Sequence, residues 1–320
     1  MTRPPMTRSQ ATPTPSTDGV APAVAVEPVE AIGAPPAAAP RRRLLGRPFV
    51  RRLVRNKIAM VALAYILFLI VIAVIGDWIA PYPPDAQDPA AAFLSPFSSG
   101  HLLGTDQLGR DVLSRLIAAD RIALVAAAQA LGLSMLIGIP PGLLAGYVGR
   151  FADNAVMRVT DAVQSLPPLI IALGIVGALG PGLSHAMLAL GFIFAPNFVR
   201  ITRAAVLELR EETFVEASRS IGTPAWQIVL RRIVPNALPP VLVQVSLVAG
   251  FALTAEASLS LLGFGVQPPQ ASWGSMLGQG YNFIYQQPWL VVFPGCAIAL
   301  AVLAFNVFGD GLRDSIGRRK

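Results

Sequence analysis

Long runs of hydrophobic residues alternate along this chain with short polar segments. Five runs reach or approach the roughly 20 apolar residues that a membrane-spanning helix needs. A sixth run, Ala162–Leu179, is apolar but interrupted by Pro167 and Pro168. Ile58–Ile75 lacks the polar face that a helix of a soluble protein carries, so we expect membrane helices. The five clear runs are Ile58–Ala80, Ile122–Tyr147, Leu183–Val199, Ala237–Leu262 and Pro288–Gly309. The pattern predicts an all-α integral membrane protein with six transmembrane helices.

Composition and charge support this class and suggest an orientation. The chain is 54% hydrophobic and 13% charged, with a net charge of +7. Arginines gather before the first run and in the segments Val148–Asp161 and Arg200–Asn236, whereas Gly263–Gln287 has no charge. Because basic loops stay in the cytoplasm, we expect a multi-pass protein of the cytoplasmic membrane with both termini cytoplasmic.

The chain divides into three regions by composition. Residues 1–40 are rich in proline and alanine without apolar periodicity, which predicts a disordered cytoplasmic tail. Residues 41–121 hold a basic juxtamembrane segment, the first span and an external loop, and residues 122–320 hold a core of five helices. The basic segment predicts contact with anionic membrane lipids; basic residues interleaved with aromatic ones, which would indicate a nucleic acid partner, are not seen.

The polar segment 207–235, which we call the elbow, carries the most specific local pattern. Leu207–Ile221 reads as a helix, and Gly222 suits the left-handed conformation at a helix C-terminus. Thr223 is a plausible N-cap of a second short helix, with Pro224 at its first position. That helix would cover Ala225–Leu230, with Pro235 marking the return to the bilayer. The pattern predicts two helices joined at a glycine, a form suited to docking a soluble partner.

Several motifs resemble one transporter family. Glu216, Ala217, Gly222 and Pro235 match, at the family spacing, the cytoplasmic "EAA" loop of ABC importer permeases, whereas Ser218, Arg232 and Val234 depart from it. Other segments look like the C-type permease of dipeptide and oligopeptide importers, and together the resemblance runs from roughly Arg51 to the C-terminus. These segments are Gly104–Arg115, Glu256–Pro269, Ser272–Gly274 and Gly309–Asp314.

The resemblance implies a type I ABC importer permease with a cytoplasmic coupling helix. Its partners would be a homologous B-type permease, cytoplasmic ATP-binding subunits and an extracytoplasmic substrate-binding protein. Its substrates would be dipeptides or short oligopeptides, with nickel chelates and glutathione left open. Glu216 would hold the elbow through an ion pair with an arginine. The coupling residues would be Glu216, Ala217, Gly222, Thr223, Pro224, Trp226, Ile228 and Pro235.

Three further features carry expectations. Glu256 lies near the external end of the fifth span, either on the translocation path or, as we favour, as a structural anchor. Gly104–Arg121 has the spacing of an amphipathic surface helix, which could receive a binding protein or rest on the membrane. Pro140 and Pro141, followed by Gly142, are expected to break the second span.

The chain lacks the residues of an ATPase or of a metal site. Its only lysines are Lys57 and Lys320, and neither follows a glycine as a phosphate-binding loop requires. His101, His185 and Cys296 are isolated from one another, so we expect no enzyme site and no cofactor. Active transport would then draw energy from a partner or from an ion gradient. A proton- or sodium-driven transporter remains the alternative, although Glu256 is the one acidic residue that would serve it.

Overall fold

A computed structural model describes residues 47–98 and 100–316, so the expected tail 1–40 lies outside the described residues. The described part is helical, with two isolated bridges and no strand. Its helices are α1 (Arg47–Arg55), α2 (Lys57–Ile79), η1 (Pro89–Ala91), α3 (Val112–Val148), α4 (Arg150–Gln164), α5 (Pro168–Leu179), α6 (Leu183–Arg210), α7 (Thr213–Ser220), α8 (Ala225–Ile228), η2 (Val229–Ile233), α9 (Val234–Leu261), α10 (Trp273–Tyr281) and α11 (Trp289–Ile316).

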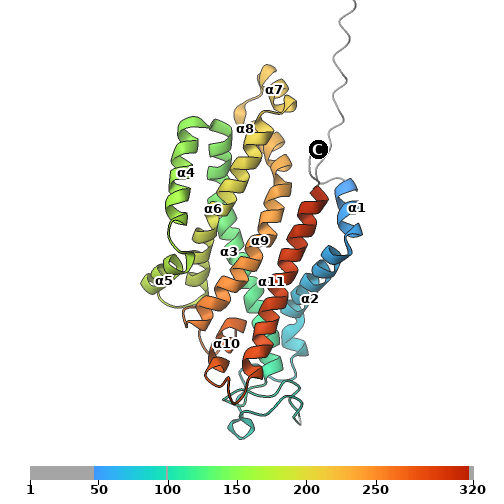
Figure 1. Ribbon diagram of the computed structural model, residues 1–320, viewed down its shortest axis with the longest axis vertical. Helices are drawn as coiled ribbons and strands as arrows, with labels where there is room; N and C mark the ends of the chain where they lie inside the picture. Colours follow the sequence, from blue (N-terminus) through green and yellow to red (C-terminus); the bar gives the residue numbers. More distant parts are fainter. Residues whose placement is uncertain (1–46, 99, 317–320) are drawn as a thin grey trace, which may run out of the picture. The chain divides into compact units, whose positions relative to one another are not determined.

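Five of these helices are long and apolar enough to cross a membrane (Figure 1). They are α2, α3, α6, α9 and α11, with α9 continuing from α8 and η2. The pair α4 and α5, bent by 84°, makes a sixth span if both helices are counted together. The all-α prediction is confirmed, but the apolar run at 162–179 is divided between two helices. Pro168 is the first residue of α5, a position where its missing amide donor costs no helical hydrogen bond.

The span α3 packs closely against α6. Gly138 and Gly142 lie at this contact: a Cβ atom on Gly138 would lie 2.4 Å from the carbonyl oxygen of Ala195, and one on Gly142 would lie 2.7 Å from that of Val199. Glycine therefore lets the two backbones approach. The expected break at Pro140 and Pro141 is wrong, since α3 continues through both. Prolines are tolerated inside membrane helices where neighbouring helices hold the backbone in place.

The amphipathic surface helix expected at Gly104–Arg121 is not present. Residues 104–111 form turns, and α3 begins at Val112 and continues into the span. Asp111 caps α3, because its Oδ2 accepts hydrogen bonds from the Ser114 amide (2.8 Å) and hydroxyl (2.7 Å). Gly109 has φ of +72°, and a Cβ there would lie 1.8 Å from the carbonyl oxygen of Asp88. The chain therefore turns sharply at this position before α3 begins.

Candidate functional site

The elbow lies at one end of the bundle, which we call the elbow end; the opposite end carries α10 and is called the α10 end (Figure 1). The single helix predicted for Leu207–Ile221 is divided, since α6 ends at Arg210 and α7 begins at Thr213. The turn between them returns Val215 to the protein interior. Val215 is buried in one cluster with Ala205, Val206, Leu209, Ile228, Ile233 and Ala237. Burial of this apolar side chain explains why the helix does not continue straight.

The predicted left-handed glycine is confirmed. Gly222 has φ of +74°, and its amide donates a hydrogen bond to the carbonyl of Arg219 (2.9 Å). A Cβ at Gly222 would meet nothing within 4 Å, so glycine is needed for the backbone conformation and not for space. The N-cap lies one residue later than predicted: Pro224 is extended (ψ 143°) and α8 begins at Ala225. Thr223 instead donates its amide to the carbonyl of Ser218 (3.0 Å).

The second part of the elbow is not a separate short helix. Residues Ala225–Leu261 continue as one helical stretch of 37 residues, with a π-helical turn at Val229–Ile233. Pro235 lies exposed in the first turn of α9 and marks no boundary. Proline lacks an amide donor, and the π turn that precedes it changes the hydrogen-bond register without ending the helix.

The elbow exposes large apolar side chains. Ile221 is 81% exposed and Trp226 is 58% exposed, and Leu230 is also exposed. Trp226 and Leu230 are four residues apart and share a helix face. We call Ile221, Trp226 and Leu230 the elbow patch. Ile221 and Leu230 were not among the predicted coupling residues. Their apolar side chains within a charged segment could have indicated them from sequence.

The other predicted elbow residues have different settings. Glu216, Ala217 and Pro224 are exposed, and Thr223 is half-buried. Ile228 is buried, so its side chain supports the elbow from within and is not available to a partner. The ion pair expected for Glu216 is not found: no basic group of the described residues lies within 4 Å of its carboxylate.

Two other arginines fasten the elbow to α3. The Arg210 Nη1 donates a hydrogen bond to the carbonyl of Gly146 (3.3 Å). The guanidinium of Arg219, on α7, lies 5.5 Å from the centre of the Tyr147 ring, which places a cation over an aromatic face. Both contacts reach the last turn of α3. A displacement of the elbow would therefore also move the end of α3. The sequence gives no sign of them, because the partners lie more than 60 residues away.

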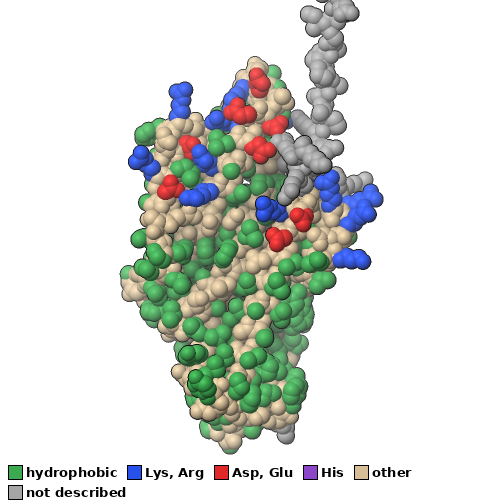
Figure 2. Space-filling view, viewed as in Figure 1, with side chains coloured by type: hydrophobic (Ala, Val, Ile, Leu, Met, Phe, Trp, Pro, Cys, Tyr) green, Lys and Arg blue, Asp and Glu red, His purple; other side chains and the backbone are tan. Residues whose placement is uncertain are grey.

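Charged side chains gather at the elbow end. Figure 2 shows the blue and red groups in the upper part of this face, with the lower part mostly hydrophobic. An ion pair of Asp153 with Arg203 joins α4 to α6, with Oδ2 lying 2.6 Å from Nη2. A second pair, Asp161 with Arg200, joins the same helices (2.6 Å). The elbow therefore lies at a polar end of the bundle, where ion pairs join α4 to α6.

Glu256 lies at the α10 end of α9 and is 1% exposed. Its Oε1 accepts a hydrogen bond from the Ser260 hydroxyl (2.7 Å), and the Ser260 oxygen accepts one from the Val266 amide (3.2 Å). The carboxyl group thus holds the chain where it leaves α9. This setting favours the structural anchor over the translocation path.

We expect Glu256→Gln to keep substrate uptake within about threefold of wild type, since the amide oxygen can still accept from Ser260. Glu256→Ala should lower the free energy of unfolding by about 1–3 kcal/mol, because Ser260 loses its acceptor in a buried site. Uptake assays and thermal unfolding check the two variants. A loss of uptake in Glu256→Gln without a change in stability would instead place Glu256 on the path.

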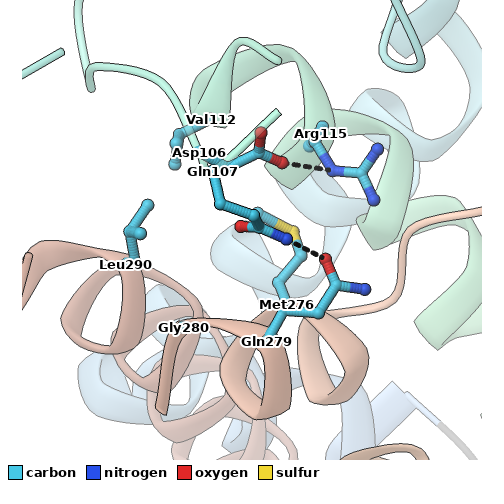
Figure 3. A pocket seen from close by; sticks show the side chains of 8 residues that line it. All are labelled: Asp106, Gln107, Val112, Arg115, Met276, Gln279, Gly280 and Leu290. Atoms are coloured by element: carbon cyan, nitrogen blue, oxygen red, sulfur yellow. Dashed lines mark hydrogen bonds and ion pairs between the residues drawn. The ribbon is translucent and has the colours of Figure 1, made fainter. Parts of the chain in front are cut away.

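A small pocket lies at the α10 end, between the N-terminus of α3 and α10 (Figure 3). Its volume is about 10 Å³, which has room for about one water molecule and not for a peptide. Gln279 Oε1 accepts from Arg110 Nη2 (3.0 Å) and from Gln107 Nε2 (3.4 Å), which ties the loop before α3 to α10. The described residues contain no group of His, Cys, Asp and Glu that could hold a metal ion.

Comparison with solved structures places the fold. Two structures titled as inward-facing conformations of the MetNI methionine ABC transporter superpose with TM-scores of 0.52 at 20% and 23% sequence identity. The first covers 62% of this chain and 94% of the other, and the second covers 64% and 97%. At this identity the likeness concerns the fold, which is that of a type I ABC importer permease.

Curated relatives match most of the chain. The dipeptide transport system permease protein DppC of Escherichia coli (strain K12) is 43% identical and covers 82% of this chain and 89% of its own length. The probable D,D-dipeptide transport system permease protein DdpC of the same strain is 36% identical over 85% of this chain and 91% of its own. The glutathione transport system permease protein GsiD of Pectobacterium atrosepticum is 37% identical, with coverages of 84% and 90%.

Two family models match successive parts of the chain. The model of the N-terminal transmembrane domain of oligopeptide transport permease C matches residues 45–96. The model of the binding-protein-dependent transport system inner membrane component matches residues 138–320, which include the elbow, α9 and α11. With this match and relatives above 30% identity over most of its length, the chain belongs to the family of binding-protein-dependent transport system inner membrane components.

Proposed function

We propose that this chain is the C-type permease subunit of an ABC importer and that its elbow receives the motion of a separate ATP-binding subunit. The observation that carries the proposal is the elbow patch, which exposes Ile221 and Trp226 on either side of the left-handed Gly222. Large apolar side chains exposed on a charged surface are typical of a protein interface. An aromatic anchor at such a surface can supply much of the binding energy.

The same geometry supports a coupling role. The patch belongs to two segments that lead into different helices: α7 follows α6, and α8 continues into α9. Arg210 and Arg219 add contacts to the end of α3. A partner that moves the elbow therefore acts on three membrane helices at once, as alternating access by rigid-body motion requires.

The distribution of basic residues supports an orientation for the chain. The elbow end carries Lys57 and the arginines of α1, α4, α7 and η2, and we expect this end to face the cytoplasm. The N- and C-terminal segments would then be cytoplasmic as well. Neither Lys57 nor Lys320 follows a glycine as in a phosphate-binding loop, so the ATP would be hydrolysed by separate subunits. These ATP-binding subunits would dock on the elbow from the cytoplasm. A homologous B-type permease and an extracytoplasmic substrate-binding protein would complete the importer.

Dipeptides or short oligopeptides are the substrates that we propose. DppC of Escherichia coli and other similar relatives carry names of dipeptide or peptide transport systems. A glutathione permease is similar to nearly the same degree, and glutathione is itself a short peptide. Uptake of labelled dipeptides in competition with glutathione distinguishes the two.

Affinity purification of wild type beside Gly222→Arg tests the proposal. A side chain at Gly222 has open space within this chain, so the variant should fold, with strain of roughly 1 kcal/mol from φ of +74°. We expect an ATP-binding subunit to accompany wild type and to be lost or reduced with Gly222→Arg.

The matched control is Gly263→Arg, at the α10 end, where φ is +82° and a Cβ also meets nothing within 4 Å. This variant should keep the ATP-binding subunit. Absence of that subunit from the wild-type preparation would contradict the importer assignment and make an ion-driven transporter the function to test.

A further inference from the structure

Helix α1 is a short amphipathic helix separate from the first span. Its residues Phe49, Val50, Leu53 and Val54 are apolar, and Arg51, Arg52 and Arg55 are basic. Asn56 then adopts an extended conformation, and its Oδ1 accepts a hydrogen bond from the Ala59 amide (3.2 Å), which caps α2. The chain therefore ends one helix at Arg55 and begins the membrane span afresh.

Three sides of α1 meet three different environments. With 100° between successive residues, Phe49 and Leu53 share one side, which is partly buried where α1 contacts α2 and α11. Val50 and Val54 share a second side and are 53% and 57% exposed. Arg51, Arg52 and Arg55 share the third, and all three are exposed.

Exposed apolar side chains also follow these valines closely in the chain. Ile58 and Val61, in the first turns of α2, are more than two-thirds exposed in a helix whose mean hydropathy suits a membrane span. Val50 and Val54 therefore lie next to the point where acyl chains begin to cover the protein. A helix with this pattern lies in the plane of the interface with its apolar side among the upper acyl chains.

Arg51, Arg52 and Arg55 lack a counter-ion within the described part of the chain. None of the ion pairs among residues 47–98 and 100–316 includes Arg51, Arg52 or Arg55. The acidic residues at the end of the neighbouring α11, Asp310 and Asp314, do not pair with them either. Figure 2 shows basic side chains projecting from this corner of the molecule. Three guanidinium groups at the level of the lipid headgroups match phosphate, which accepts paired hydrogen bonds from arginine.

We propose that α1 and the first turn of α2 form a binding site for an anionic phospholipid of the adjacent leaflet. Arg51, Arg52 and Arg55 bind the phosphate and the anionic headgroup, and Val50, Val54 and Ile58 contact the acyl chains. The site holds α1 at the membrane surface. It depends on the membrane location of the chain and not on which substrate is carried.

The test uses the full chain, with the subunits that accompany it, in nanodiscs of phosphatidylcholine and phosphatidylglycerol. After transfer to mild detergent, mass spectrometry measures the ratio of the two lipids retained on wild type and on Arg51→Gln/Arg55→Gln. Each arginine near an anionic surface contributes about fivefold, so we expect the preference for phosphatidylglycerol to fall about 25-fold.

Two further variants keep the result decisive. Arg231→Gln/Arg232→Gln removes the same charge from η2 at the same end and should leave the lipid ratio unchanged. Arg51→Lys/Arg55→Lys keeps the charge and should retain most of the preference. An unchanged ratio in the glutamine variant, an equal loss in the η2 variant, or a full loss in the lysine variant would each overturn the proposal.

Discussion

Trp226→Glu is expected to abolish most ATP-driven uptake while leaving the membrane fold intact. Trp226 is 58% exposed on α8, whereas Ile228 on the same helix is buried. Replacing Trp226 should therefore disturb the packing of the protein little. An aromatic anchor at an interface contributes about 2–4 kcal/mol to binding. Its replacement by a carboxylate should therefore weaken docking of the ATP-binding subunit about 30- to 700-fold.

Uptake of labelled dipeptide, with the amount of membrane-inserted protein measured in parallel, checks this prediction. Tyr285→Glu is the matched control, because Tyr285 is an almost fully exposed aromatic residue at the α10 end. Trp226→Phe should restore much of the uptake. Normal uptake in Trp226→Glu would show that the elbow patch is not the docking surface.

Gly138→Leu is expected to destabilise the protein more than any surface change. A Cβ there would lie 2.4 Å from the Ala195 carbonyl oxygen and 2.8 Å from the Phe198 Cβ, so α3 and α6 must separate. Overpacking costs about 1–3 kcal/mol, and contact with a backbone atom puts this site at the upper end. The apparent Tm in detergent should fall by about 4–6 °C.

Gly132→Leu, on the same helix, is the comparison. A Cβ at Gly132 meets nothing within 4 Å, and the residue is exposed. This variant should keep at least the wild-type Tm, since leucine has a higher helix propensity than glycine. Equal losses in both variants would mean that helix chemistry, and not the contact with α6, explains the effect.

Five of the spans could be predicted from sequence because each contains a long apolar run. Ile58–Ala80, for example, differs from α2 by one residue at each end. The second span was predicted to begin at Ile122 but begins at Val112. Arg115 and Asp120 made the start look polar, whereas both are buried: Arg115 contacts Asp85 and the carbonyl of Pro84, and Asp120 is enclosed within the bundle. Hydropathy alone does not predict such tertiary contacts.

The left-handed turn of the elbow could be predicted because Gly222 marks a specific backbone conformation. Its internal form was predicted less well. The break at Glu211 and Glu212 depends on burial of Val215 beside Ile233, which is 18 positions further along the chain. The uninterrupted passage through Pro235 depends on the π turn. Neither the break nor the continuous helix can be recognised from the local sequence. A proline more often marks the end of a helix than a position that follows a π turn.

The unbroken passage from Ala225 to Leu261 has a mechanical meaning. At about 1.5 Å per residue, its 37 residues extend about 55 Å, with Trp226 at one end and Glu256 near the other. Such a helix acts as a lever arm: a tilt of about 5° pivoting at the elbow would displace its far end by about 5 Å. A small change of tilt imposed at Trp226 would thus produce a large displacement of the helix near Glu256, at the other end of the bundle.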